Sequence, residues 1–142
     1  MLYQKDFYSW AHQQSDLLRQ GQFDQLDLSH LIEELTDLGN RHYDQLESRL
    51  TQLVAHLLKW QVQHWRRSNS WRATIRVQRT SIEKLLRRNP GLKSRLHEAL
   101  QESWSEAKDL AIAETDLPDK NFPETIPFSL AEILNPDFWP AP

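Results

Sequence analysis

Arg49 and His56 are separated by six residues in a segment with helical spacing of apolar side chains. Seven positions make about two helical turns, so the two side chains point about 20° apart around the helix axis. A histidine in this position can move a proton, and an arginine can stabilise the charge that develops on a phosphate. The pair therefore predicts catalytic residues for RNA cleavage without a metal ion. The alternative is structural, with Arg49 paired to a neighbouring acid and His56 hydrogen-bonded between helices.

A second candidate site consists of arginines that come after this pair. Their planar guanidinium groups suit phosphate, and interleaved tryptophans could stack on bases. We expect five of them to bind a partner: Arg66, Arg67, Arg72, Arg76 and Arg87. Trp65 and Trp71 fall on the apolar stripes of their helices, which favours a place in the core. Glu83 lies four residues after Arg79, and this spacing predicts an ion pair between the two.

The charge is strongly segregated along the chain. Residues 1–55 have a net charge of −5, residues 56–88 have +8, and residues 89–142 have −6, which together give −3. Such asymmetry is typical of a site for a polyanion. The alternative is that the acidic flanks pack beside the basic middle and neutralise it.

Metal binding is a third hypothesis, because helical bundles hold metals through glutamate and histidine side chains. The candidate ligands are Glu33, Glu34, Glu47, His56 and His64. None of them form an E-x-x-H or H-x-x-x-H motif, and His56 and His64 lie about 80° apart around a helix. A metal site formed by Glu34 and His56 from two different helices remains an open alternative. We nevertheless expect no metal site and no cofactor.

Composition narrows the class of protein. A chain of 142 residues with 39% hydrophobic residues is typical of one soluble domain. The absence of cysteine excludes disulfides and thiolate ligands. The first residues lack the apolar run of a signal peptide, and no segment reaches the ~18 apolar residues of a membrane span. We therefore expect a cytoplasmic protein that does not enter a membrane.

Helical periodicity recurs along most of the chain, whereas alternating strand patterns are weak. It predicts an all-α fold, a bundle of about five helices with a proline-rich C-terminal arm. The bundle should occupy residues 1–117, and the arm, residues 118–142, should pack on it as part of a single domain. The expected helices cover residues 6–20, 28–38, 41–66, 71–88 and 92–114, and a capping box at Ser129 and Glu132 predicts a short one over 130–134. Gly21 and Gly39 should end the first two.

Several short motifs together resemble a known family. They include Leu31-Ile32-Glu33-Glu34-Leu35, His56-Leu57-Leu58-Lys59-Trp60, Ser70-Trp71-Arg72 and Glu114-Thr115. The chain resembles, over nearly its whole length, the family called domain of unknown function 29, which is abundant in cyanobacteria and other bacteria. The resemblance implies an all-helical domain and no particular activity. Separately, the spacing of Arg49 and His56 is similar to the motif of the HEPN ribonucleases.

The leading hypothesis is an interaction module that binds a protein partner or a polyanion, such as a nucleic acid, through a basic helix face. The first alternative is a metal-independent ribonuclease that uses Arg49 and His56. The second alternative is a metal-binding helical bundle. The sequence leaves open whether the protein is an enzyme, and whether it forms a homo-oligomer.

Overall fold

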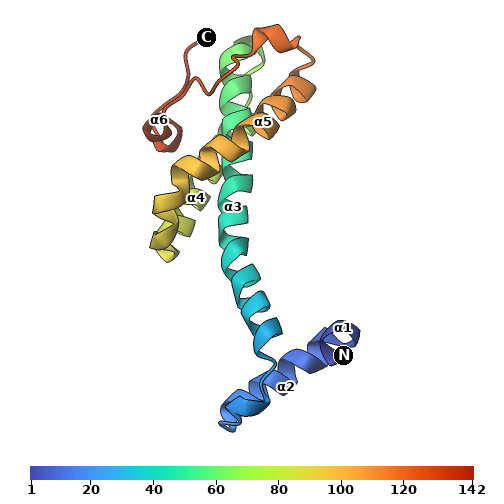
Figure 1. Ribbon diagram of the computed structural model, residues 1–142. Helices are drawn as coiled ribbons and strands as arrows, with labels where there is room; N and C mark the ends of the chain where they lie inside the picture. Colours follow the sequence, from blue (N-terminus) through green and yellow to red (C-terminus); the bar gives the residue numbers. More distant parts are fainter. The chain divides into compact units, whose positions relative to one another are not determined.

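The computed structural model describes residues 1–142 and contains helices, turns and irregular segments but no strand (Figure 1). The expected all-α class is confirmed. The α-helices are α1 (Leu2–Lys5), α2 (Phe7–Arg19), α3 (Leu28–Val62), α4 (Asn69–Arg88), α5 (Leu96–Thr115) and α6 (Leu130–Leu134). None of these helices combines the length and the apolar character that a membrane span requires.

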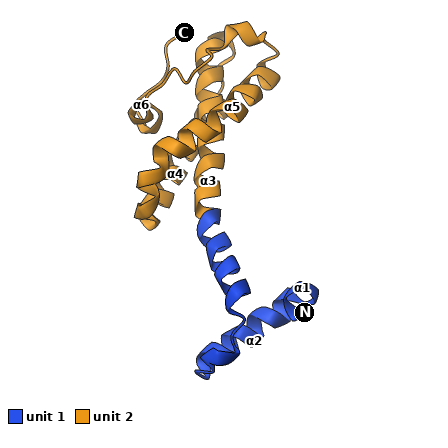
Figure 2. Cartoon of the chain, viewed as in Figure 1, with its two compact units in different colours: residues 1–41 blue, residues 42–142 orange.

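The chain divides into two compact units, an N-terminal unit of residues 1–41 and a C-terminal unit of residues 42–142 (Figure 2). The boundary falls inside α3, so one helix contributes residues to both. The proline-rich residues 118–142 belong to the C-terminal unit together with most of α3 and all of α4 and α5.

Short polar side chains cap the start of three of the helices, and one of these caps, at Ser129 and Glu132, was predicted from the sequence. Asp6 accepts a hydrogen bond from the backbone of Ser9, and Ser68 accepts one from the backbone of Trp71. Ser129 and Glu132 form the expected reciprocal capping box at the start of α6. Each of these contacts satisfies a backbone N–H that the first turn of a helix leaves without a partner.

The two glycines expected to end helices behave differently. Gly21 has a φ of 70°, the left-handed conformation that follows a helix end, and it comes after α2 as predicted. Gly39 does not end a helix, because α3 continues through it from Leu28 to Val62. The expectation of two helices, 28–38 and 41–66, was therefore wrong. A glycine inside a helix costs only about 1 kcal/mol, and no proline follows to block the next turn.

The core of the C-terminal unit lies between α3, α4, α5 and the arm. The apolar stripe predicted for α3 is buried there, with Leu46, Leu50, Leu53 and Leu57 fully inaccessible. The other elements add Ile75 and Ile82 from α4, Ala99, Leu100, Ala107 and Ala111 from α5, and Phe122, Phe128 and Ile133 from the arm. The small alanines of α5 let its backbone approach closely, so the large side chains of α3 fill the space between the helices.

Trp65 does not belong to this core, contrary to expectation, because 63% of it is exposed. The sequence predicts a helix that continues to residue 66. In the structure α3 ends at Val62, and a 3-10 turn, His64–Arg66, follows. The change of backbone conformation turns Trp65 away from the buried stripe. Trp71, by contrast, is partly buried against the core as predicted.

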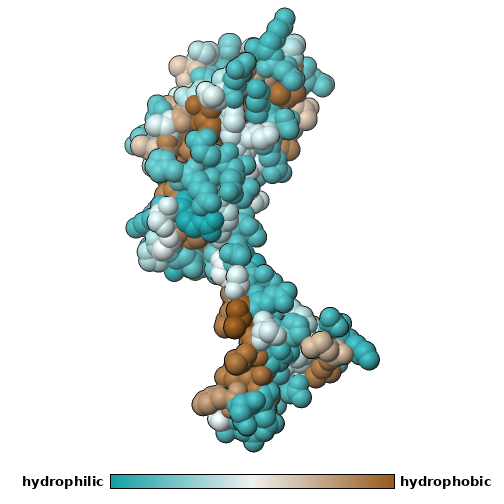
Figure 3. Space-filling model, in the orientation of Figure 1, coloured by the Kyte–Doolittle hydropathy of each residue, from teal (hydrophilic) through white to brown (hydrophobic).

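The N-terminal unit has a small aromatic centre and a large exposed apolar surface. Trp10 is buried and donates its indole N–H to Asp27, while the ring of Tyr3 stacks on His30 at 3.9 Å between centroids. The apolar side predicted for the first part of α3 is exposed, with Ile32 and Leu35 each more than 60% accessible. Figure 3 shows brown residues gathered along this part of α3.

Candidate functional site

A cleft of about 430 Å³ opens in the C-terminal unit between the middle of α3 and the end of α4. Basic and polar side chains make up almost all of its walls. It is lined by His42, Gln45 and Arg49 of α3, by Ser81, Lys84, Leu85 and Arg88 of α4, and by Asn89. We call these residues the cationic cleft.

The helical repeat explains why these side chains meet. Positions 42, 45 and 49 fall within about 60° of one another around α3, and so form one narrow face. Lys84 and Arg88 are four residues apart on α4 and therefore lie on the same face of the helix, one turn apart. Leu50 and Leu85 belong to the buried core, and Leu85 also lines the cleft. The polar faces consequently come together at the edge of a well-packed core.

The three cations of the cleft have no acidic partner. Lys84 and Arg88 are exposed and form no ion pair, and neither does Arg49. The Nη1 atom of Arg49 donates to the side-chain oxygen of Gln78, at 3.3 Å. This neutral partner orients the guanidinium group and leaves its charge uncompensated. A cleft with three positive side chains and no carboxylate in its lining attracts anions.

His42 adds an unused hydrogen-bonding atom to the same cleft. Its Nδ1 atom is buried and has no hydrogen-bond partner. Buried polar atoms in folded proteins are nearly always paired, and a ring nitrogen without a partner therefore marks a place that a ligand atom can occupy. When Nδ1 carries a proton it can donate to a phosphate or carboxylate oxygen.

The acidic residues of α3 lie on its opposite side. A separate cavity of about 210 Å³ is lined there by Asp44, Glu47 and, from α5, Glu106. Burial raises the pKa of Glu47, and the nearby carboxylate of Glu102 raises it further. Positions 44 and 47 point about 140–160° away from position 42 around the helix. The acidic side chains that α3 and α5 bring together in this cavity are therefore absent from the cationic cleft.

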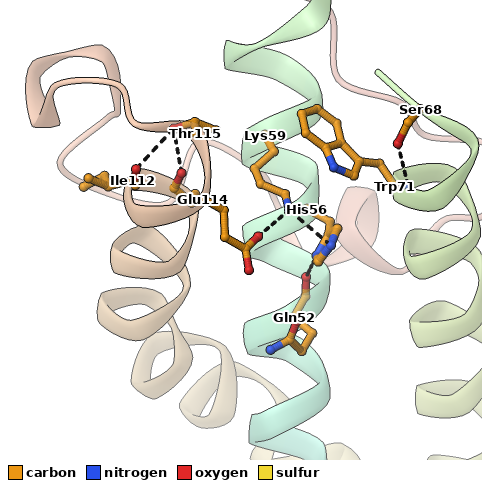
Figure 4. A network of polar contacts seen from close by, with 9 residues as sticks. Gln52, His56, Lys59, Ser68, Trp71, Ile112, Glu114 and Thr115 are labelled. Atoms are coloured by element: carbon orange, nitrogen blue, oxygen red, sulfur yellow. Dashed lines mark hydrogen bonds and ion pairs between the residues drawn. The ribbon is translucent and has the colours of Figure 1, made fainter. Parts of the chain in front are cut away.

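His56, the predicted partner of Arg49, belongs to a different group of residues, drawn in Figure 4. Its Nδ1 atom lies 2.8 Å from the backbone oxygen of Gln52, and its Nε2 atom lies 3.3 Å from the ammonium group of Lys59. A carbonyl can only accept and an ammonium can only donate. The imidazole must therefore carry its proton on Nδ1 and be neutral.

Lys59 is the centre of this group and is buried. Its ammonium group also forms an ion pair with Glu114 of α5 and lies 5.0 Å from the ring centroid of Trp71 in α4. One lysine thus connects three helices. Burial lowers the pKa of His56, and the charge of Lys59 lowers it further against the opposing effects of the Gln52 carbonyl and Glu114.

The structure does not bring Arg49 and His56 together as a catalytic pair. Arg49 lines the cationic cleft and contacts Gln78, whereas both ring nitrogens of His56 are engaged by Gln52 and Lys59. The two side chains lie about 10 Å apart along the axis of α3, from the rise of seven residues. Neither nitrogen of His56 is free to exchange a proton with a substrate in this arrangement.

The predicted binding arginines have several different surroundings. Arg67 donates through Nε to the backbone oxygen of Trp60 and through Nη2 to that of Pro140, and burial lowers its pKa. It therefore connects the end of α3 to the arm. Arg72 lies 5.4 Å from the Trp60 ring centroid and donates to Asn69. These two arginines contact their own chain.

The remaining three are more accessible. Arg66 and Arg76 are exposed, and Arg76 lies 5.9 Å from the ring centroid of Trp139 in the arm. Arg87 lies 3.6 Å from Glu83 in an exposed ion pair. The expected pair between Arg79 and Glu83 is not formed, because Arg79 is buried against the arm and donates to the backbone of Ile133.

The candidate metal ligands do not gather at one point. No group of three or more histidine and acidic side chains has the geometry to hold a metal ion. Glu34 accepts a hydrogen bond from the hydroxyl of Tyr3, and this contact raises the Tyr3 pKa to about 12. Glu33 and His64 are exposed.

Of the residues that line the cleft, only Arg49 was predicted from the sequence. His42 precedes Arg49 by seven positions, the same spacing that drew attention to His56. Lys84 and Arg88 form an i, i+4 pair on α4. These spacings were visible, but nothing in the sequence shows which face of α3 meets which face of α4.

A family model whose description is "Domain of unknown function DUF29" matches residues 2–139, nearly the whole chain. No curated protein and no solved structure matches the chain.

Proposed function

Because the chain belongs to the DUF29 family of domains of unknown function, a membership that assigns no activity, we propose its function from the cationic cleft alone. The protein is a polyanion-binding module that takes phosphate groups of single-stranded nucleic acid into the cleft between α3 and α4. The observation that supports the proposal is the meeting of Arg49, Lys84 and Arg88 in one cleft without any carboxylate.

Five of the lining residues can contribute to such binding. Arg49 offers a planar guanidinium group, which matches the geometry of a phosphate and can donate two parallel hydrogen bonds. Lys84 and Arg88 add mobile positive charge at the rim, and the Ser81 hydroxyl supplies a neutral donor. The buried Nδ1 of His42 gives a further donor when protonated.

The basic residues near the end of α4 also have a simpler interpretation. Lysine and arginine in the last turn of a helix interact favourably with its dipole. That effect accounts for Arg88, which lies in the last turn of α4, but not for Lys84, which lies one turn earlier. It does not account for Arg49 or His42, which come from α3 and face the same cleft. Contributions from two helices to one cleft favour the binding proposal.

The test is fluorescence anisotropy with a labelled single-stranded RNA of about 20 nucleotides, at low salt. The double variant Lys84→Ala/Arg88→Ala removes two charges from the cleft. The control Lys93→Ala/Lys120→Ala removes two charges from exposed positions outside it. We expect the first to weaken binding about tenfold or more, since a hydrogen bond to a charged group contributes about 1.5–3 kcal/mol.

Equal losses in the two variants would mean that only the general charge of the protein matters, and would refute the cleft as the site. A third variant, Arg66→Ala/Arg76→Ala, tests the broader basic face predicted from the sequence. If this variant loses more affinity than the cleft variant, the site lies on that face instead. If the natural protein does not bind the RNA at all, single-stranded RNA is excluded as the ligand.

A further inference from the structure

A third cavity, of about 500 Å³, lies between α4 and the C-terminal arm. It is separate from the cationic cleft and shares no lining residue with it. Apolar side chains from both elements make most of its surface: Ile82, Leu86, Leu134 and Pro136. The polar residues in its lining are Arg76, Arg79, Thr80 and Glu83. A mostly apolar cavity of this size with a few polar groups is typical of a small-molecule site.

Arg79 is the unusual residue of this cavity, because its guanidinium group is buried and only 6% of the residue is exposed. Its Nε donates to the backbone oxygen of Ile133 at 2.8 Å, and its Nη2 donates to that of Glu132 at 3.4 Å. One edge of the guanidinium group is thus used by the end of α6. The Nη1 atom is buried and has no partner.

A buried arginine without an ion-pair partner is costly unless an anion compensates it. Arg79 forms no ion pair in the structure, and burial lowers its pKa. Both Arg79 and Arg76 lie within 6 Å of the ring centroid of Trp139, which offers the face of its π-system and no full negative charge. The backbone carbonyls of Ile133 and Glu132, which accept hydrogen bonds from Arg79, carry no full negative charge either.

The charges in the lining indicate which kind of ligand would suit the cavity. Arg76 and Arg79 contribute two positive charges, while Glu83, the one acid in the lining, already forms an ion pair with Arg87, which lies outside the cavity. The lining therefore keeps a positive charge that a carboxylate can offset. Carboxylate oxygens also suit the free Nη1 of Arg79, because charge-assisted hydrogen bonds to arginine are among the strongest in proteins.

We propose that this cavity binds an amphipathic monocarboxylate, with its carboxylate at Arg79 and Arg76 and its apolar chain against Ile82, Leu86 and Leu134. A linear chain of about eight carbons fits a cavity of this volume. The arm forms one wall, so the ligand would also stabilise the arm on α4. This site is independent of the proposed nucleic-acid cleft, and either can fail without the other.

The experiment is calorimetric titration of the full chain with sodium octanoate, and with octanol as the uncharged control of the same chain length. We expect saturable 1:1 binding of octanoate and at least about tenfold weaker binding of octanol, because a hydrogen bond to a charged group contributes about 1.5–3 kcal/mol. In parallel, the Nε–H signal of Arg79 should shift in NMR spectra as octanoate is added.

Two variants and a control locate the site. Arg76→Gln removes one charge from an exposed position and should weaken octanoate binding severalfold, while Leu134→Trp should fill the cavity and abolish binding. Arg72→Gln removes the same charge one turn away on α4, outside the cavity, and should bind octanoate as the natural protein does. Should Leu134→Trp fail to fold, the comparison of Arg76→Gln with Arg72→Gln still shows whether octanoate binds in this cavity.

Three results would overturn the proposal. The first is the absence of saturable octanoate binding up to about 10 mM, which would leave less than about 3 kcal/mol of binding free energy. The second is equal affinity for octanol, which would exclude recognition of the carboxylate. The third is equal loss in Arg76→Gln and Arg72→Gln, which would place the ligand elsewhere on the basic surface.

Discussion

The ammonium group of Lys59 in α3 forms an ion pair with the carboxylate of Glu114 in α5, and the two ends of this pair differ in their access to water. The lysine side chain is 5% exposed, whereas that of the glutamate is 45% exposed. Removing the charge of one partner therefore has a different consequence from removing the charge of the other. The acid can be solvated alone, but the lysine cannot.

Glu114→Gln should destabilise the C-terminal unit more than Lys59→Met. The glutamine variant leaves a buried ammonium group without a charged partner, and we expect it to lower the free energy of unfolding by about 2 kcal/mol. Methionine in place of Lys59 keeps a similar volume and leaves a solvated acid, so the loss should be below about 1 kcal/mol. Urea denaturation at neutral pH measures both values.

The control for this comparison is Glu83→Gln, which breaks the exposed ion pair with Arg87. Exposed pairs of this kind contribute little, so its effect should stay within about 0.5 kcal/mol. If Lys59→Met proves the more damaging change, the ion pair contributes net stability and the buried lysine is not the liability inferred from its burial.

His56 should make the stability of the protein depend on pH. Burial lowers its pKa in the folded state, so the folded protein favours the neutral ring. Its contribution is fully present above the unfolded pKa of about 6.5, and is lost as the pH falls through the lower folded value. The groups that face the ring are Lys59 and Glu114, and protonation would place a second positive charge beside Lys59.

The test is the free energy of unfolding between about pH 7.5 and pH 5 for the natural protein and for His56→Asn. Asparagine can still donate to the Gln52 carbonyl but does not titrate. We expect the variant to lose less stability than the natural protein as the pH falls. His97→Asn, at an exposed position of α5, serves as the control, and a variant at His56 that keeps the full pH dependence would contradict the assignment.

Local sequence patterns predicted the parts of the fold that depend on nearby residues. Ser68 and the Ser129–Glu132 box act within one helical turn, so their caps could be predicted from spacing. The stripe from Leu46 to Leu57 repeats with the helical period and is buried. The same period occurs at Ile32 and Leu35, which are exposed. Periodicity identifies an apolar face but not whether another element covers it.

The site could be predicted less well, because it depends on contacts between distant residues. Arg49 and Lys84 line one cleft across 35 positions, and their meeting depends on how α3 and α4 pack. The surroundings of His56 also depend on distant residues. Lys59, which contacts His56, forms an ion pair with Glu114 of α5. Arg79 shows the same dependence on distant residues. It is buried against the arm and donates to the backbone of Ile133, more than 50 residues later in the chain.

The arm should contribute measurably to stability through Trp139. Its ring centroid lies 4.7 Å from that of Trp60, and Arg76 and Arg79 lie near its face. Trp139→Ala should lower the free energy of unfolding by about 3 kcal/mol, because a large aromatic contact and two cation–π contacts are lost. Trp65→Ala is the matched control, since Trp65 is 63% exposed, and should change stability by less than about 1 kcal/mol.

Equal effects of the two tryptophan substitutions would contradict the packing of the arm on α4. A loss at Trp65 alone would mean that its exposed ring is covered in solution by another molecule. Each variant removes one indole ring from the C-terminal unit.

The salt dependence of RNA binding gives a count of the phosphate contacts in the cationic cleft. Each phosphate that a single strand places against a cation contributes about −0.7 to the slope of log Kobs against log salt. Lys84→Ala/Arg88→Ala should therefore make the slope less steep by about 1.4. The control Lys93→Ala/Lys120→Ala should keep the slope of the natural protein, because neither residue lines the cleft. Anisotropy titrations at four or more salt concentrations measure these slopes, and an unchanged slope in the cleft variant would show that Lys84 and Arg88 contact no phosphate.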